Sequence, residues 1–293
     1  MSRIPRAIAL LALCFVVLAS RSARADENKN QDVLAWNPKW KKFRASEYVL
    51  TGVAGAASLS VFFLVKAPKQ PTWTHGILID DDVRSALRLR NPKLRDDART
   101  LSNWTAVANV LWVVAADSIV PAWRGKSDVA TQMLLMDAES FAFSTLLTTS
   151  LFSTVGRARP SYADCQRDPN FDPLCRSGTT SSFPSGHTNG AFTAAGLGCA
   201  HHLHLALYGD PTADTLACVG MITVASTTGT LRVMGDRHYA SDVLTGALIG
   251  FAFGYGIPTV FHYGKASEGT QASLMVSPVG AGFPFGPTIS GTF

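Results

Sequence analysis

The sequence predicts an all-α helical bundle that crosses a membrane. Hydrophobic residues make up 47% of the 293 residues and charged residues only 16%. The mean hydropathy of +0.15 is high for a soluble protein. The apolar residues also gather in runs of about 20 residues, the length that a helix needs to cross a bilayer. These six runs lie near 48–65, 104–122, 129–151, 189–207, 215–231 and 243–261. We therefore expect six transmembrane helices, with an active site at one membrane face.

The first and last runs are the strongest, whereas the third and fourth contain polar residues. Asp137 and Glu139 interrupt the third run, and Asp117 lies in the second. Because a charge inside a bilayer is costly, we expect these carboxylates to pair with arginines in the interior; a polar path is the alternative. The fourth run ends in His201, His202 and His204. We interpret these histidines as interfacial residues at a helix end rather than as metal ligands.

The N-terminus has the features of a secretory signal peptide. Arg3 and Arg6 precede the apolar run 7–19, and Ala23-Arg24-Ala25 provides a small-x-small cleavage site. An uncleaved anchor is the alternative, but the run is short for a membrane span. We divide the chain into a signal peptide (1–25), a polar lead-in (26–46), a helical-bundle domain (47–262) and a Gly/Pro-rich extended tail (263–293).

The cysteines indicate an oxidising compartment. Cys165 and Cys175 lie ten residues apart in a polar loop, a spacing that suits a local disulfide. Cys199 and Cys218 fall inside apolar runs, where we expect inert core thiols. Cys14 lies within the predicted signal peptide.

The charge pattern argues against nucleic acid as a partner. The net charge of +5 comes without a Lys/Arg block or interleaved aromatic residues. A basic balance suits a phosphorylated substrate or an anionic lipid. The charged loop 66–103 contains Arg84-Ser-Ala-Leu-Arg88-Leu-Arg90, which we interpret as an amphipathic helix at the headgroups.

The segment Phe183-Pro184-Ser185-Gly186-His187-Thr188 predicts a loop that leads into a helix. Pro184 fixes φ, Ser185 can accept a hydrogen bond from a free backbone N–H, and Gly186 allows a ligand to approach closely. The unpaired N–H groups of the first turn form a natural seat for an anion. His187 would lie at its mouth, where an imidazole can give or take a proton.

Two further blocks accompany this segment. The first is Gly156-Arg157-Ala158-Arg159-Pro160, and the last runs from Arg232 through His238 to Asp242. If the last block is helical, His238 and Asp242 share one face at i and i+4. The carboxylate could then fix the tautomer of His238 and leave its other nitrogen free to act as a nucleophile.

Together the three blocks resemble, over residues 159–242, the signature of the type 2 phosphatidic acid phosphatase superfamily. Its members include membrane lipid phosphatases, soluble class A acid phosphatases and vanadium haloperoxidases. The resemblance implies that His238 attacks to form phosphohistidine and that His187 protonates the leaving oxygen and then activates water. Arg159 and Arg232 would bind the non-bridging phosphate oxygens, together with N–H groups at Ser185 and Gly186.

The sequence departs from the family pattern at two positions. Phe152 stands where the family has a lysine seven residues before Arg159, and Leu231 replaces the serine before Arg232. Arg157 is our candidate for the missing positive charge. Arg237 could equally be a phosphate contact or a surface charge.

The sequence therefore predicts a phosphatase that acts on lipid phosphate monoesters or pyrophosphates without a metal or other cofactor. Its partners would be a phosphorylated lipid and the membrane. The alternatives are a soluble periplasmic acid phosphatase, a haloperoxidase or a non-catalytic lipid-binding membrane protein.

The expected location is a bacterial-type inner membrane with the active site facing the periplasm. Six crossings after a cleaved signal peptide would instead put the three blocks and loop 66–103 in the cytoplasm. Two observations favour the periplasmic side: the resemblance, and the pair formed by Cys165 and Cys175. We give them more weight than the helix count. Two alternatives would reconcile this with the helix count: one run fails to cross, or the signal peptide stays attached.

Overall fold

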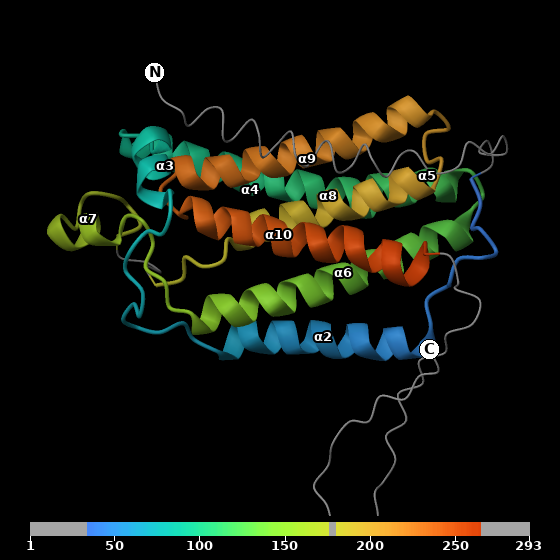
Figure 1. Ribbon diagram of the computed structural model, residues 1–293, viewed down its shortest axis with the longest axis horizontal. Coiled ribbons are helices and arrows are strands. Elements are labelled where there is room, and N and C mark those ends of the chain that lie inside the picture. The colour runs from blue at the N-terminus through green and yellow to red at the C-terminus, as the bar shows by residue number, and fades with distance from the viewer. Residues whose placement is uncertain (1–33, 176–179, 265–293) are drawn as a thin grey trace, which may run out of the picture.

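The computed structural model describes residues 34–175 and 180–264, and these residues form the predicted all-α bundle (Figure 1). The predicted signal peptide and residues 265–293 of the predicted tail lie outside the described residues. The long helices are α2 (Ala45–Leu64), α4 (Pro92–Leu111), α6 (Ser127–Thr154), α8 (Gly186–His204), α9 (Pro211–Met234) and α10 (Ala240–Ile257). α4 continues through η1 (Trp112–Asp117) into α5 (Ser118–Trp123), and α10 continues into η2 (Pro258–His262). The short helices α3 (Asp80–Leu87) and α7 (Tyr162–Arg167) lie together at one end of the bundle.

α8 forms the centre of the bundle, and most of its residues are buried. It packs most closely against α10 through glycines spaced four residues apart on α10. A Cβ atom at Gly250 would collide with the Asn189 carbonyl, and one at Gly254 with the Thr193 carbonyl. The absence of side chains at these positions lets the two backbones touch. This contact holds the start of α8 beside the start of α10, and those two starts carry His187 and His238.

Four segments of the described chain are long and apolar enough to cross a membrane. They are Ala45–Leu64, Pro92–Trp123, Pro211–Met234 and Ala240–His262. The expected runs 129–151 and 189–207 do form helices, α6 and α8, but these are not among the four candidates. Four of the six predicted membrane spans are therefore supported. The other two helices are more polar because much of their surface faces protein: α6 buries Asp137 and Glu139, and α8 is enclosed by its neighbours.

The loop predicted for 66–103 is shorter and more structured than expected. α4 begins at Pro92, where the Asn91 side chain accepts hydrogen bonds from the first free N–H groups. α3 is the expected short helix, but it does not lie free at a surface. Arg84 on α3 forms ion pairs with Asp236, in the turn between α9 and α10, and with Asp164 on α7, and these tie α3 to both.

Two disulfides link the described cysteines. Cys165 and Cys175 form a disulfide in the polar loop, as their spacing predicts. The prediction of inert thiols at Cys199 and Cys218 is wrong, because these residues form a second disulfide between α8 and α9. Their Cα atoms lie 4.4 Å apart. Nothing in the sequence shows that these two helices are neighbours, and only that packing brings the sulfur atoms together.

The end of the bundle where α8 finishes contains buried histidines that are paired with carboxylates. We call it the far end, and the end with His187 the site end. The pairs are His201 with Asp137 at 3.0 Å, His202 with Asp214 at 2.7 Å and with Asp117 at 3.3 Å, and His262 with Glu139 at 3.1 Å. The carboxylates are thus paired in the interior as expected, but with histidines rather than arginines. His201 and His202 are fully buried, so their interfacial assignment is wrong.

Candidate active site

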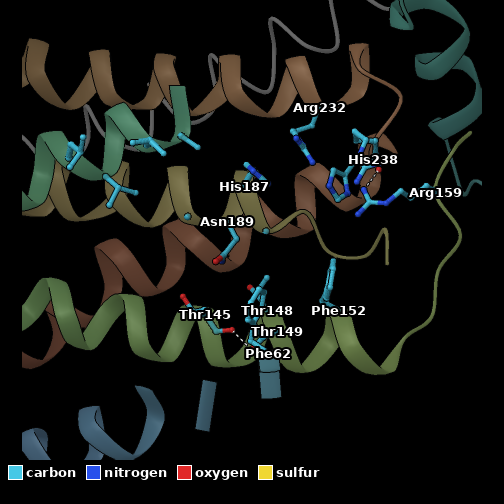
Figure 2. A pocket seen from close by; sticks show the side chains of 17 residues that line it. Phe62, Thr145, Thr148, Thr149, Phe152, Arg159, His187, Asn189, Arg232 and His238 are labelled. Atoms are coloured by element: carbon cyan, nitrogen blue, oxygen red, sulfur yellow. Dashed lines mark hydrogen bonds between the residues drawn. The ribbon is translucent and has the colours of Figure 1, made fainter. Parts of the chain in front are cut away.

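The three sequence blocks meet around a cavity of about 560 Å³ at the site end (Figure 2). Its polar wall contains both predicted histidines and three arginines, and its other wall is made by side chains of α2, α4 and α6. The first wall contains Arg159, Gly186, His187, Asn189, Arg232, Arg237 and His238, and the second includes the apolar Phe62, Val107, Val110, Leu111 and Phe152 and the polar Thr148. The cavity therefore joins a cationic site to an apolar channel.

His238 lies in the turn just before α10 and its ring is almost completely buried. Its Nδ1 lies 2.6 Å from the Ser182 carbonyl oxygen. A carbonyl can only accept, so Nδ1 carries the proton and Nε2 has the free lone pair. Burial lowers the pKa of His238 well below its usual range, and the positive charges of Arg159 and Arg232 lower it further. The imidazole is therefore neutral near pH 7 and can act as a nucleophile.

Asp242 does not hold His238 in the predicted way. Its Oδ2 lies 3.9 Å from Nδ1 of His238, too far for a hydrogen bond. The reason is that α10 begins at Ala240, so residues 238 and 242 do not share a helical face. Asp242 instead accepts hydrogen bonds from the Ser182 hydroxyl at 2.6 Å and the Tyr239 N–H at 2.8 Å. It thereby joins the loop before α8, which contains Ser182, to the turn that carries His238.

His187 is the second residue of α8 and is exposed to the cavity. Gly186 also borders the cavity, and the space where its Cβ would lie is open. Ser185 differs from the prediction: its side chain is buried, and its hydroxyl bonds to the Thr188 hydroxyl at 2.8 Å rather than capping the helix. The first N–H groups of α8 therefore remain available beside His187, as an anion site requires.

The cavity is strongly electropositive. Nη1 of Arg159 donates to the Arg237 carbonyl at 2.8 Å, and Nη1 of Arg232 contacts the Ser102 hydroxyl at 3.2 Å. Burial lowers the pKa of Arg159, and the nearby charges of Arg237 and Arg232 lower it further. Burial and the charge of Arg99 lower the pKa of Arg237 to about 10. Mutually repelling cations around one cavity favour an anion there.

Arg157 does not reach the cavity, so its assignment as a phosphate contact is wrong. Its side chain is fully buried and forms ion pairs with Asp242 and, at 2.7 Å, with Asp80. Its guanidinium lies between the rings of Trp73, at 3.9 Å, and Tyr239, at 4.3 Å. Arg157 therefore clamps the first block to the start of α10. A sequence cannot distinguish this partnered arginine from Arg159, two residues later.

Sequence reasoning left Arg237 undecided and missed Asn189. Arg237 lines the cavity, as does Phe152 at the family's lysine position. Asn189 is buried one turn after Gly186, and its side chain exchanges hydrogen bonds with Ser144 on α6. These contacts join elements that are distant in sequence. The one feature of the sequence that could have pointed to the cavity is the position of Arg237 directly before His238.

Comparisons with known proteins find one family, one curated protein and one solved structure that are similar to this chain. A family model described as "PAP2 superfamily" matches residues 135–265, which include both cavity histidines and all three cavity arginines. The lipid A 1-phosphatase of Porphyromonas gingivalis is 34% identical over 168 residues, which cover 53% of this chain and 32% of that protein. The match thus spans about a third of the curated relative. A crystal structure of a transmembrane PAP2-type phosphatidylglycerolphosphate phosphatase from Bacillus subtilis aligns over 73% of this chain and 93% of its own, with 19% identity and a TM-score of 0.45. The chain is thus similar to the PAP2 superfamily over the residues that carry the three blocks and the polar wall of the cavity.

Proposed function

We propose that the protein is a membrane phosphatase that hydrolyses lipid phosphate monoesters or pyrophosphates through a phosphohistidine intermediate. The observation that carries this proposal is the single cavity that His187, His238 and the cavity arginines share. The similarity to the PAP2 superfamily and to lipid A 1-phosphatase supports it.

The reaction follows from the two histidines. Nε2 of His238 attacks phosphorus, and the bond from phosphorus to the lipid oxygen breaks as protonated His187 gives its proton to that oxygen. Neutral His187 then takes a proton from water. The resulting hydroxide attacks phosphorus, the P–N bond to His238 breaks, and inorganic phosphate leaves.

The phosphate would be held by Arg159, Arg232 and Arg237, together with the N–H groups at the start of α8. Forked guanidinium donors suit the non-bridging oxygens, and the charge that builds up on them needs neutralising. Arg237 takes the part that the family gives to the lysine, because Phe152 at that position brings no charge. These side chains supply the positive charge of the site, and we propose that no metal is required.

The surroundings of the cavity fit a lipid substrate. Phe62 of α2 and Val107, Val110 and Leu111 of α4 line the side of the cavity away from the arginines. Large apolar side chains are also exposed on the outer faces of these helices, including Phe63 and Trp104. Such a surface is stable in lipid rather than in water. We propose that α6 and α8 cross the membrane together with the four candidate spans beside which they run.

We propose that the site end faces the periplasm of a bacterial-type inner membrane. The disulfide between Cys165 and Cys175 lies in the loop that joins two of the three blocks, at the site end. A disulfide there persists in an oxidising compartment, which the periplasm is and the cytoplasm is not.

The test is phosphate release by the protein purified in detergent, with EDTA present. The substrates are phosphatidate, phosphatidylglycerophosphate, an isoprenyl diphosphate and p-nitrophenyl phosphate as a soluble compound. We expect release from lipid phosphates in EDTA, and inhibition by vanadate, which mimics the transition state at phosphorus. No release from any substrate would favour the lipid-binding alternative. Release of the protein from membranes by carbonate, with activity on the soluble compound alone, would favour the periplasmic acid phosphatase.

A further inference from the structure

A second cavity, of about 270 Å³, adjoins the first at the site end. The two cavities share His187, Arg232 and Arg237. The other lining residues of the second cavity are Asp96, Arg99, Thr100, Asn103 and Leu174, so its wall is polar whereas most of the first cavity's wall is apolar. The phosphate site therefore lies at a junction between a polar and an apolar cavity.

One helix face runs along both cavities. Residues 96, 99, 100 and 103 of α4 follow the i, i+3, i+4, i+7 spacing of a single face, and all four line the polar cavity. The same face continues into Ala106, Val107, Val110 and Leu111, which line the apolar cavity. The face changes from polar to apolar between residues 103 and 106. Arg232 lies beside this change, because its Nη1 is 3.4 Å from Oδ1 of Asn103. A phosphate monoester has one organic substituent, so a substrate that fills both cavities needs a leaving group with a polar part next to its phosphate and apolar chains that run back along this face.

The direction of the reaction indicates which part of the substrate enters the polar cavity. In an in-line displacement the leaving oxygen lies opposite the nucleophile. His238, the proposed nucleophile, lines only the apolar cavity, whereas His187, the proposed donor to the leaving oxygen, lines both. The polar cavity thus opens on the leaving-group side. Its volume of about 270 Å³ is room for a small polar group but not for acyl chains.

The wall of the polar cavity combines a rigid part with available hydrogen-bonding groups. Arg99 is fixed, because it donates to the Gly235 carbonyl at 2.7 Å and to both oxygens of Asp172 at 2.9 and 2.6 Å. Thr100 is exposed to the cavity, and its hydroxyl has no hydrogen bond among those found within the described residues. Asn103 meets Arg232 through Oδ1, which leaves its NH₂ group to donate.

We propose that this polar cavity binds a hydroxyl-bearing leaving group, a sugar or a glycerol, of the lipid phosphate. The inference rests on the proposed function and deepens it. Thr100 and Asn103 provide the hydrogen bonds to the hydroxyl groups, and the acyl chains of the same leaving group run along the face of α4 into the apolar cavity. The enzyme would then prefer an acylated sugar 1-phosphate or phosphatidylglycerophosphate to phosphatidate, whose diacylglycerol leaving group carries no further hydroxyl.

The test compares kcat/KM for those three substrates in the wild type and in Thr100→Val. We choose Thr100 because Asn103 also contacts Arg232. Loss of a neutral hydrogen bond should lower the ratio of kcat/KM for a hydroxyl-bearing substrate over that for phosphatidate by about three- to tenfold. Thr100→Ser, which keeps the hydroxyl, should restore the ratio. The hydroxyl-bearing substrate whose kcat/KM falls more, the sugar phosphate or phosphatidylglycerophosphate, identifies which polyol the cavity accepts.

Thr215→Val is the matched control. Thr215 is exposed at the start of α9, at the far end, and its hydroxyl donates only to the Pro211 carbonyl of its own helix. This variant should leave the ratio unchanged. An equal effect of Thr100→Val on all three substrates, or none on any, would overturn the subsite while leaving the phosphatase intact. A wild type that hydrolyses none of them would instead overturn the proposed function itself.

Discussion

The two ends of α8 use histidine in opposite ways. At the site end, His187 and its neighbour His238 line a cavity beside three arginines. At the far end, His201 and His202 are buried, and both ring nitrogens of each have a partner: Asp137 and Tyr263 for His201, and Asp117 and Asp214 for His202. Residues 187 and 201 are about 21 Å apart along the helix.

The comparison shows that the partners of the ring, more than its burial, separate a reactive histidine from a structural one. His238 is as buried as His202. Among the described residues, only its Nδ1 forms a hydrogen bond, to a carbonyl oxygen that fixes the tautomer. Its Nε2 therefore keeps a lone pair that can attack the substrate. A ring with two carboxylate partners is held in place and neutralises their charge. Each prediction below would break or sharpen this difference.

The largest effect is expected for His238→Ala. Without the nucleophile, kcat/KM for lipid phosphate should fall by about 10³-fold or more. The measurement is phosphate release by the purified variant, alongside its thermal unfolding. The unfolding temperature should stay close to that of the wild type, because the ring makes a single hydrogen bond. A variant that retains full activity would show that His238 is not the nucleophile.

At the far end, His202→Ala should act on stability instead. It leaves the buried carboxylates of Asp117 and Asp214 without their ring partner, which should cost about 3–5 kcal/mol in the free energy of unfolding. Thermal unfolding in detergent measures the loss, and activity per folded molecule should be preserved. Lost activity in a protein of unchanged stability would mean that the far end takes part in the reaction.

Arg237→Ala tests the third cation of the cavity. Loss of one phosphate contact should lower kcat/KM by about 10- to 100-fold. Adding Phe152→Lys to this variant should restore part of the activity, because both positions line the same cavity. Arg124→Ala, which removes an exposed arginine at the far end, is the control. If the added lysine restores nothing, Arg237 does not take the part of the family's lysine.

The smallest effect concerns pH. Because burial and the adjacent arginines hold the pKa of His238 well below its usual range, the ring stays deprotonated as the pH falls through 6.5. The acid limb of kcat/KM that reports the nucleophile should therefore lie well below pH 6.5. A profile of kcat/KM from pH 4 to 9 measures it. A limb centred at pH 6.5 would indicate an unperturbed histidine.

Much of the fold and the outline of the site could be predicted from the sequence. Hydropathy runs locate the long helices, because a helix in lipid must be apolar over its length. The Pro184-Ser185-Gly186-His187 segment predicts the start of α8, and a disulfide between Cys165 and Cys175 follows from their local spacing. The start of α4 was misplaced because its first turns are polar, although Asn91-Pro92 is a cap signal.

By itself, the sequence determined the helices, the order of the three blocks and the residue types that phosphoryl transfer requires, since all of these are local or depend on spacing. Tertiary structure decided which partner each side chain meets. It separated Arg157, clamped between Trp73 and Tyr239, from Arg159 in the cavity, and it gave Ser182 rather than Asp242 to His238. It also joined Cys199 to Cys218. The physical reason is that hydrogen bonds and ion pairs act over a few ångströms between helices whose adjacency no local pattern in the chain encodes.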